Sequence, residues 1–235
     1  MKKNKAIFIA GTGTGVGKTR ITGLLAHFFQ KLGYQVATQK WVQSGISETP
    51  PHSDVEAHYM WMKQPLPSAI LYKAMCPYQF PFPAAPHLSA AQSGKTISRE
   101  KILTCYSSLK KQMDILFVEG TGGLMMPYND HAHFLDIMTD LQIPTVLVVK
   151  NELGCINHSL LTLEALKVRG IPILGLLFNQ TETEAAPLIL QDNPKIIQKQ
   201  SGIKSLGVMP YTTKIELAYD VIQPIAQQLQ QALEL

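Results

Sequence analysis

The stretch that decides the fold is "AIFIAGTGTGVGKT", residues 6–19. An apolar run typical of a buried strand leads directly into a glycine-rich segment, and a helical pattern follows over 18–32. This order predicts a phosphate-binding loop, because backbone N–H groups and the positive end of a helix together attract anions. We expect Lys18 to reach the β- and γ-phosphates of a nucleotide and the Thr19 hydroxyl to bind Mg²⁺.

The spacing of this loop departs from the common pattern. That pattern places four residues between the first glycine and the Gly-Lys pair, whereas five residues separate Gly11 from Gly17. The alternative interpretation is a glycine-rich turn without a ligand. The position of Gly-Lys-Thr at the junction of strand and helix favours phosphate binding.

Further apolar runs, bounded by turn signals, alternate with helical patterns along the 235 residues. Most of the runs are continuous, which is typical of parallel strands buried on both faces. We expect strands at 6–10, 35–40, 114–119, 144–149, 172–178 and 206–210, helices at 18–32, about 98–113, 132–141 and 156–169, and a helical tail from about residue 214. The sequence therefore predicts one α/β domain over residues 1–235, with a doubly wound, mainly parallel sheet flanked by helices and ligands beyond the carboxyl ends of the strands.

The segment "CPYQFPFPAAP" (76–86) contains four prolines. Because proline lacks an N–H donor and disrupts helices, we expect a rigid surface connection here, neither helix nor central strand.

Composition excludes several classes of protein. Apolar residues make up 46% of the chain and charged residues 16%, which is typical of a globular domain. The formal net charge is +4 with dispersed lysines, so we expect no nucleic-acid partner. An odd set of three cysteines without paired spacing favours a reducing cytoplasm. No apolar run approaches the roughly 18 residues of a membrane span, so we expect a cytoplasmic protein without a membrane partner.

Two predicted strands end in charged residues. Glu119 ends "DILFVE", where a carboxylate could hold Mg²⁺, although a helix cap or a solvated strand end is the alternative. Lys40 ends "QVATQK" and could stabilise developing phosphate or carbamate charge. Taken in isolation, Lys40 is better interpreted as a solvated surface lysine.

Two later motifs carry weaker signals. In "HSDVE" (52–56), Asp54 stands at an expected helix start, where capping alone would explain it. His52 and His58 have no neighbours with metal-ligand spacing and are interpreted as surface histidines. In "LGCINH" (153–158), small residues at a helix start predict an anion site suited to a carboxylate, with Cys155 as a small packed residue.

Taken together, "GTGTGVGKT", "QKWVQSG", "HSDVE", "VEGTGG", "LGCINH" and "LLFNQ" resemble the dethiobiotin synthetase family of the biotin pathway, in order and spacing, over about residues 5–212. The phosphate-binding loop of that family carries the additional residue, which accounts for the spacing of Gly11 and Gly17. The resemblance implies a Mg²⁺-assisted reaction of 7,8-diaminopelargonate, CO₂ and ATP. One amine becomes a carbamate, ATP phosphorylates the carbamate, and the second amine displaces phosphate to close a ureido ring.

The resemblance also implies roles for residues. Thr14, Lys18 and Lys40 would surround the carbamate and the transferring phosphate, and Ser44 would contact the substrate. The implied Mg²⁺ ligands are Thr19, Asp54 and Glu119. The residues implied to contact the nucleotide are Gly15, Val16, Gly17, Lys18, Thr19, Arg20, Asp54, Glu119, Gly120, Thr121, Gly122, Asn179, Gln180, Pro210, Tyr211 and Thr212. Of these, Asn179, Gln180 and Pro210 to Thr212 would lie near the adenine. The family is a homodimer, in which Gly154, Cys155, Ile156 and Asn157 would bind the substrate carboxylate from across the interface.

Three positions depart from the family pattern. Gly13 stands where the family commonly has Asp, so the charge of that Asp is missing. Trp41 replaces the Pro that usually follows the active-site lysine, and it offers a large surface for covering the substrate. Thr121 replaces a usual Ala.

Other classes of protein remain as alternatives. A partition-type ATPase switch would dimerise on ATP, but such proteins usually carry an additional lysine early in the loop, and Gly11 to Gly17 contain none. A cobyrinate-type amidotransferase usually adds a glutaminase domain, for which 235 residues leave little room. A nucleotide-binding module without catalysis is the third alternative.

Overall fold

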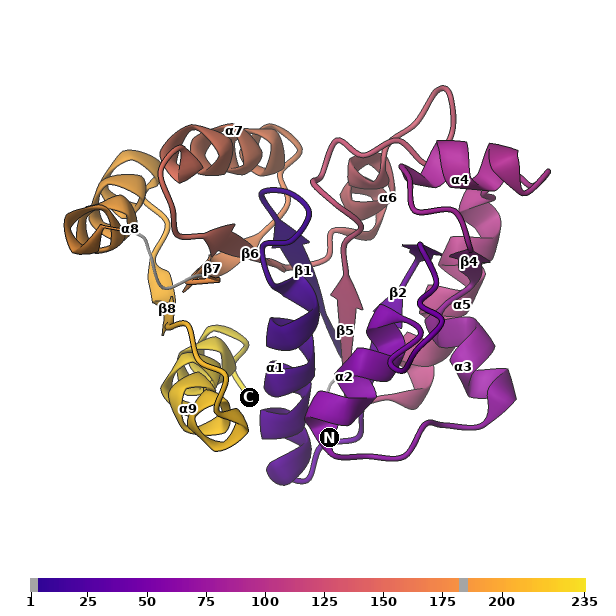
Figure 1. Ribbon diagram of the computed structural model, residues 1–235, viewed down its shortest axis with the longest axis horizontal. Helices are drawn as coiled ribbons and strands as arrows, with labels where there is room; N and C mark the ends of the chain where they lie inside the picture. Colours follow the sequence, from indigo (N-terminus) through magenta and orange to yellow (C-terminus); the bar gives the residue numbers. More distant parts are fainter. Residues whose placement is uncertain (1–3, 182–185) are drawn as a thin grey trace.

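A six-stranded parallel sheet forms the centre of the protein in the computed structural model, which describes residues 4–181 and 186–235 (Figure 1). The strand order is β2-β5-β1-β6-β7-β8, and each neighbouring pair runs parallel. The strands are β1 (Lys5–Gly11), β2 (Val36–Lys40), β5 (Ile115–Glu119), β6 (Thr145–Lys150), β7 (Ile173–Asn179) and β8 (Ser205–Met209). All six predicted strands are confirmed within one or two residues at each end.

Helices cover both faces of this sheet. They are α1 (Lys18–Lys31), α2 (Asp54–Met62), α3 (Ala69–Met75), α4 (Pro86–Gln92), α5 (Arg99–Gln112), α6 (Phe134–Leu141), α7 (Cys155–Val168), α8 (Pro187–Ser201) and α9 (Ile215–Ala232). Figure 1 shows α1 and α9 on one side of the sheet and α6 and α7 on the other. The doubly wound α/β prediction is therefore confirmed. None of the helices in the described ranges combines the length and apolar character that crossing a membrane requires.

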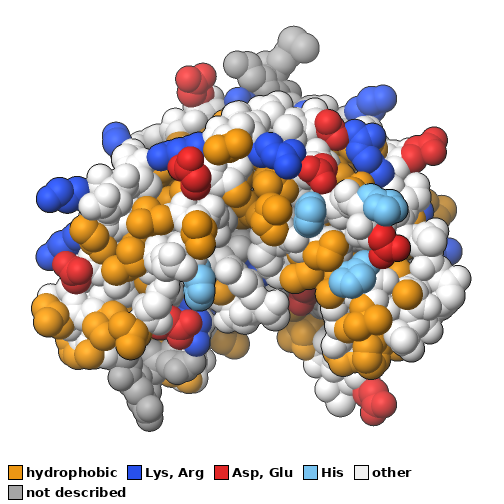
Figure 2. Space-filling view, turned by 90° about the horizontal axis from the view of Figure 1, so that it is seen from above, with side chains coloured by type: hydrophobic (Ala, Val, Ile, Leu, Met, Phe, Trp, Pro, Cys, Tyr) orange, Lys and Arg blue, Asp and Glu red, His pale blue; other side chains and the backbone are white. Residues whose placement is uncertain are grey.

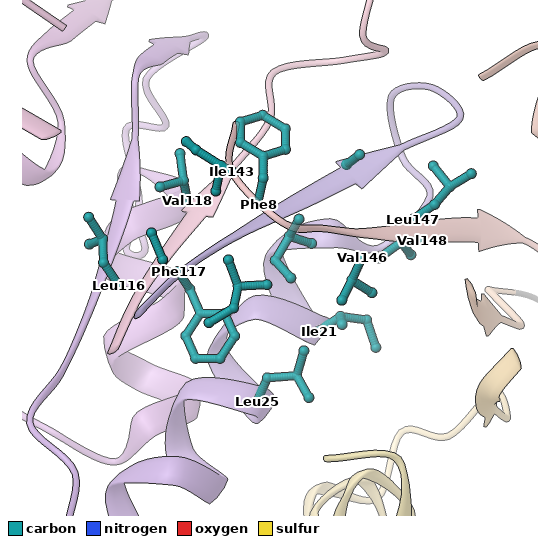
Figure 3. Packing of buried hydrophobic residues seen from close by; sticks show 14 of the residues in the cluster. Phe8, Ile21, Leu25, Leu116, Phe117, Val118, Ile143, Val146, Leu147 and Val148 are labelled. Atoms are coloured by element: carbon teal, nitrogen blue, oxygen red, sulfur yellow. The ribbon is translucent and has the colours of Figure 1, made fainter. Parts of the chain in front are cut away.

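The core explains why the strands are apolar without alternation. Ile7, Phe8 and Ile9 are consecutive residues of β1, and all three are buried because layers pack on both faces of the strand. Ile21 and Leu25 of α1 lie against one face of the sheet, as Figure 3 shows. This packing holds the start of α1 directly beyond the end of β1.

The proline-rich segment differs from its prediction. Tyr78–Phe80 forms a short strand, β4, which pairs in parallel with β3 (Val42–Ser44) in a second, two-stranded sheet. Tyr78 and Phe80 are buried, so this part of the segment is core and not a surface connection. The prediction that it avoids helix and the central sheet holds, and α4 begins only at Pro86, where a missing N–H costs no hydrogen bond.

Trp41 also differs from its expected position. Its side chain is 1% exposed and lies between Phe8 and Phe134, with ring centroids at 5.3 and 5.9 Å. Its indole N–H donates to Gln39 Oε1 at 3.1 Å. Trp41 therefore fills the core beneath the end of β2 and presents no surface to a substrate.

Neither positive nor negative side chains dominate the face of the protein that Figure 2 shows. On the face that Figure 2 shows, Lys and Arg side chains are interspersed with Asp and Glu side chains and with apolar ones. A nucleic-acid interface would instead require cations gathered into a stripe or patch. The absence of a nucleic-acid partner stays a prediction.

Candidate functional site

The phosphate-binding loop joins β1 to α1, and glycines shape it. Gly15 has φ 74° and Gly17, the residue that caps α1, has φ 95°, both in the left-handed region that favours glycine. The Lys18 ammonium donates a hydrogen bond to the carbonyl oxygen of Gly13 at 2.7 Å. Burial, followed by the charge of nearby Lys40, lowers the pKa of Lys18 to about 8. The loop therefore holds a lysine whose charged form an anion would stabilise.

Asn179, at the end of β7, contacts this loop through a hydrogen bond. Its Nδ2 donates to the carbonyl oxygen of Val16 at 2.9 Å, and the side chain is buried. A Cβ atom added at Gly17 would lie 2.1 Å from Asn179 Nδ2, so only glycine fits there. The role of Asn179 near an adenine stays a prediction, because the contact that the structure shows is to the loop itself.

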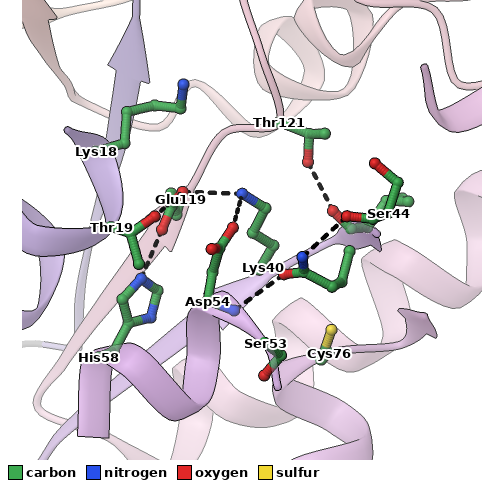
Figure 4. Close-up of polar contacts among 12 residues, drawn as sticks. Lys18, Thr19, Lys40, Ser44, Ser53, Asp54, His58, Cys76, Glu119 and Thr121 are labelled. Atoms are coloured by element: carbon green, nitrogen blue, oxygen red, sulfur yellow. Dashed lines mark hydrogen bonds and ion pairs between the residues drawn. The ribbon is translucent and has the colours of Figure 1, made fainter. Parts of the chain in front are cut away.

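Lys40 and Glu119 face each other across neighbouring strands. The register of β2 and β5 pairs the two residues directly, and Lys40 Nζ donates to Glu119 Oε1 at 2.8 Å (Figure 4). The same ammonium forms an ion pair with Asp54. Lys40 is 6% exposed, so its interpretation as a solvated surface lysine is wrong. Burial by itself would lower the pKa of Lys40, but the charges of Glu119 and Asp54 outweigh burial and raise it above its ordinary value.

Glu119 is the most heavily contacted group of the site. Its side chain is 1% exposed, which contradicts the alternative of a solvated strand end. Thr19 Oγ1 donates to Glu119 Oε1 at 3.1 Å, so the first turn of α1 meets the end of β5. Burial alone would raise the pKa of Glu119, but the charge of Lys40 and the hydrogen bond from His58 hold it well below its usual range. Glu119 is therefore a carboxylate held ionised inside the protein.

Asp54 is not a helix cap. The cap of α2 is Ser53, whose side chain accepts a hydrogen bond from the backbone N–H of Glu56 at 3.2 Å. Asp54 is the first helical residue, and its own N–H donates to Gln43 Oε1 at 3.0 Å. Its carboxylate is therefore free of the capping role and turns to Lys40.

His58 contradicts its interpretation as a surface histidine. It is fully buried, and its Nε2 lies 2.5 Å from Glu119 Oε2 (Figure 4). A signal for this was present in the sequence, because residues four apart on a helix share one face and His58 follows Asp54 by four. His52 is half-buried and contacts Ser47 through its ring.

A cavity of about 610 Å³ brings most of the predicted site residues together. The predicted residues that line it are Thr14, Gly15, Gly17, Lys18, Thr19, Lys40, Ser44, Asp54, Glu119, Thr121 and Gly122. Its other lining residues were not predicted and are Gln43, Pro83, Ala84, Ala85, Pro86 and Met126. The unpredicted wall comes mainly from the end of the proline-rich segment, which β3 and β4 place opposite the loop.

Several predicted residues lie outside the lining of this cavity. Arg20 places its guanidinium over the ring of Trp61, 5.3 Å from the centroid. The remaining predicted nucleotide contacts outside the lining are Val16, Gly120, Asn179, Gln180, Pro210, Tyr211 and Thr212. Their contacts with a nucleotide stay predictions.

The start of α7 also lies apart from this cavity. Gly154 caps the helix with φ 93°, and Gly154 and Asn157 are exposed. Cys155 is buried, and burial raises the pKa of its thiol, as expected for a packed residue. The role of Gly154 to Asn157 across a dimer interface stays a prediction.

The oxygen atoms at the cavity suit a hard cation. Thr19, Asp54 and Glu119 supply one hydroxyl and two carboxylates to a single cavity, and oxygen is the ligand type that Mg²⁺ prefers. Across residues 4–181 and 186–235, no group of three or more His, Cys, Asp or Glu side chains could hold a metal ion unaided. A Mg²⁺ ion here would therefore share its coordination with nucleotide phosphates and water, which is its usual mode of binding.

Solved structures share this fold at low sequence identity. The MinC:MinD cell division protein complex of Aquifex aeolicus matches with TM-score 0.62 and 15% identity, over 98% of this chain and 96% of that one. MinD from Pyrococcus horikoshii, complexed with Mg-ADP, matches with TM-score 0.61 and 16% identity, over 97% of each chain. ParA of pNOB8, bound to nonspecific DNA, matches with TM-score 0.58 and 14% identity, over 98% of each chain. At these identities the matches show the P-loop ATPase fold alone.

Sequence comparisons identify the family. A family model described as "AAA domain" matches residues 5–218. ATP-dependent dethiobiotin synthetase BioD of Bacillus cereus (strain G9842) is 33% identical over 204 residues, which cover 87% of this chain and 82% of that protein. The protein of the same name from Bacillus anthracis (strain CDC 684 / NRRL 3495) matches with the same identity and coverage. With a match that spans most of both chains, this protein belongs to the family of ATP-dependent dethiobiotin synthetases.

Proposed function

We propose that this protein is an ATP-dependent ligase of biotin biosynthesis that converts 7,8-diaminopelargonate and CO₂ to dethiobiotin. The observation that carries the proposal is the meeting of two lysines at one cavity. Lys18 comes from the phosphate-binding loop and Lys40 from the end of β2, and both line the same 610 Å³ space. A nucleotide-binding module needs the first lysine but not the second.

The loop would bind the ATP phosphates. Its backbone N–H groups and the start of α1 favour anions, and Lys18 would move from the Gly13 carbonyl oxygen to the β- and γ-phosphates. Because Lys18 is largely buried, a phosphate would also stabilise its protonated form. Thr14 lies in the same loop and would face the transferring group.

Lys40 would act on the bond that forms between the carbamate and the γ-phosphate. Negative charge accumulates there as phosphoryl transfer proceeds, and an ammonium already fixed in place stabilises that charge without reorganising. Asp54 and Glu119 fix the Lys40 ammonium before any substrate arrives. The substrate diamine would lie between this ammonium and the wall that contains Ser44 and Pro83.

Thr19, Asp54 and Glu119 would hold Mg²⁺, which neutralises phosphate charge when it is bound. For the substrate carboxylate we propose the exposed helix start at Gly154 to Asn157 of a partner subunit. Since these residues lie outside the lining of the cavity, a homodimer with shared sites would complete the substrate site.

The test is ADP release from MgATP and bicarbonate, with and without 7,8-diaminopelargonate. Diamine-dependent release with formation of dethiobiotin supports the synthetase. Release that responds to DNA, vesicles or a protein partner, and not to the diamine, would instead indicate a partition-type switch, whose fold this chain shares. Slow release that responds to none of these would contradict catalysis.

A further inference from the structure

We propose that His58 is a positioning residue for Glu119, which it holds so that one edge of the carboxylate faces the nucleotide and Mg²⁺ side of the cavity. The proposal rests on the proposed function only in assuming that Mg²⁺ and a nucleotide bind there. Nothing in the motifs of the sequence assigns a role to His58.

The contacts of Glu119 divide between its two oxygens. Oε1 accepts from Thr19 Oγ1 at 3.1 Å and from Lys40 Nζ at 2.8 Å, both of which line the cavity. Oε2 faces the opposite way and meets His58 Nε2 at 2.5 Å. His58 does not line the cavity, so its contact comes from behind the carboxylate (Figure 4).

The direction of this hydrogen bond follows from chemistry. A carboxylate only accepts, so Nε2 of His58 must carry the hydrogen. The other ring nitrogen, Nδ1, has no hydrogen-bond partner among the described residues. Glu119 is thus the hydrogen-bond partner of the fully buried imidazole among the described residues.

Close packing of two helices places the ring within reach. Gly23 of α1 lies against α2, and a Cβ added there would come within 2.6 Å of Trp61 Cβ and 3.1 Å of the His58 carbonyl oxygen. Any larger residue would push α2 outward and carry His58 away from Glu119. The approach of the helices therefore serves the contact.

The four polar side chains form a chain of three contacts across three elements. Asp54 and His58 share one face of α2, and they contact Lys40 and Glu119, which pair with each other across β2 and β5. A carboxylate with contacts on Oε1 only could rotate about its side-chain bonds. The contact on Oε2 removes that freedom, and such outer contacts typically change metal affinity by about 10- to 100-fold.

The test compares three substitutions of His58 by the Mg²⁺ dependence of ADP affinity, measured by titration calorimetry. Gln extends its amide nitrogen to about the place of His Nε2, whereas Asn reaches only to about the place of Nδ1, and Leu has no donor. We expect His58→Gln to keep the Mg²⁺ dependence of the parent within a few-fold. His58→Asn and His58→Leu should need about 10- to 100-fold more Mg²⁺ for the same ADP affinity.

Two controls separate positioning from folding. His27→Gln alters a half-buried histidine of the same α1–α2 region, which contacts the Met62 carbonyl oxygen at 3.0 Å and no site residue, and should leave the Mg²⁺ dependence unchanged. ADP affinity measured with chelator present should be equal in parent and His58 variants. The Gln and Asn variants have the same chemistry, so their difference survives even if the Leu variant fails to fold.

Equal Mg²⁺ dependence in parent, Gln and Asn variants would overturn the proposal, and so would equal loss in Gln and Asn. Both outcomes are read from ADP and Mg²⁺ alone. A failure of diamine-dependent turnover would instead contradict the proposed function and leave this result intact.

Discussion

Replacing Lys40 by Gln removes the cation at the centre of the site while keeping much of the length of the side chain. Lys40 is the common partner of Asp54 and Glu119, so the substitution leaves two carboxylates without their cation. If Lys40 stabilises the charge that develops between carbamate and γ-phosphate, its loss should reduce diamine-dependent ADP release by about 100- to 1000-fold, or about 3–4 kcal/mol. Affinity for a non-hydrolysable ATP analogue with Mg²⁺ should stay close to that of the parent.

The structure adds a cost in stability to the same substitution. Removing one partner of a buried ion pair typically costs about 3–5 kcal/mol, because a charge stays buried without compensation. Glu119 is almost fully buried, but the Asp54 side chain is 28% exposed and water can solvate it. We therefore expect a loss in free energy of unfolding near the lower end, about 3 kcal/mol, measured by urea denaturation.

Lys150→Gln provides the matched control. Lys150 also ends a parallel strand and pairs with a carboxylate, Glu152, at 2.6 Å, but it does not line the cavity. Its substitution should leave turnover within a few-fold of the parent. If Lys40→Gln also keeps turnover within a few-fold, Lys40 has no part in the reaction. If instead affinity for the ATP analogue and turnover fall by the same factor in Lys40→Gln, Lys40 serves binding and not the transition state.

Three further predictions concern the phosphates, the metal and the dimer. The pKa of Lys18 is about 8 in the folded protein against 10.5 otherwise, so the unfolded chain binds more protons between these values and stability should rise with pH across that window. If a bound phosphate restores the charge of Lys18, nucleotide binding at pH 8 should be accompanied by uptake of about half a proton. Calorimetry in buffers of different ionisation enthalpy should show this uptake in the parent and not in Lys18→Met. Lys18→Ala and Glu119→Ala should both lose turnover, and raised Mg²⁺ should partly restore only Glu119→Ala; normal activity in either variant contradicts the assignments. Mixing Lys18→Ala with Asn157→Ala subunits should restore some activity through one intact shared site, and a fully active monomer in sedimentation would exclude shared sites.

The strands and their charged ends could be predicted because both signals are local. Continuous apolar runs locate β1, β5 and β6, and in a parallel sheet their carboxyl ends must lie at one edge. Their positions at strand ends place Lys40 and Glu119 at the edge of the sheet where the loop lies, but the strand end alone favoured a solvated surface lysine at position 40. What the sequence left open was the contact between them, since strand order and register depend on the whole sheet.

The missed features depend on contacts between distant segments. The spacing of four from Asp54 places His58 on the same face of α2, but its burial depends on Gly23, far away in the sequence, which lets α2 approach α1. Helix α8 contains Pro194, which local rules count against a helix, yet tertiary packing holds the helix together. Trp41 follows a strand end where exposure is common, and only the packing of Phe8 and Phe134 reveals it as core.

The direct pairing of Lys40 with Glu119 also bears on how the chain folds. Strand β2 lies at the edge of the sheet, where only β5 fixes its alignment. A shift of one residue would turn Lys40 to the opposite face and bring Gln39 beside Glu119, which would leave a buried carboxylate without its cation. Misaligned arrangements of the edge strand are thereby disfavoured relative to the native one. The ion pair at the centre of the proposed site thus also favours the native alignment of the strand that carries Lys40.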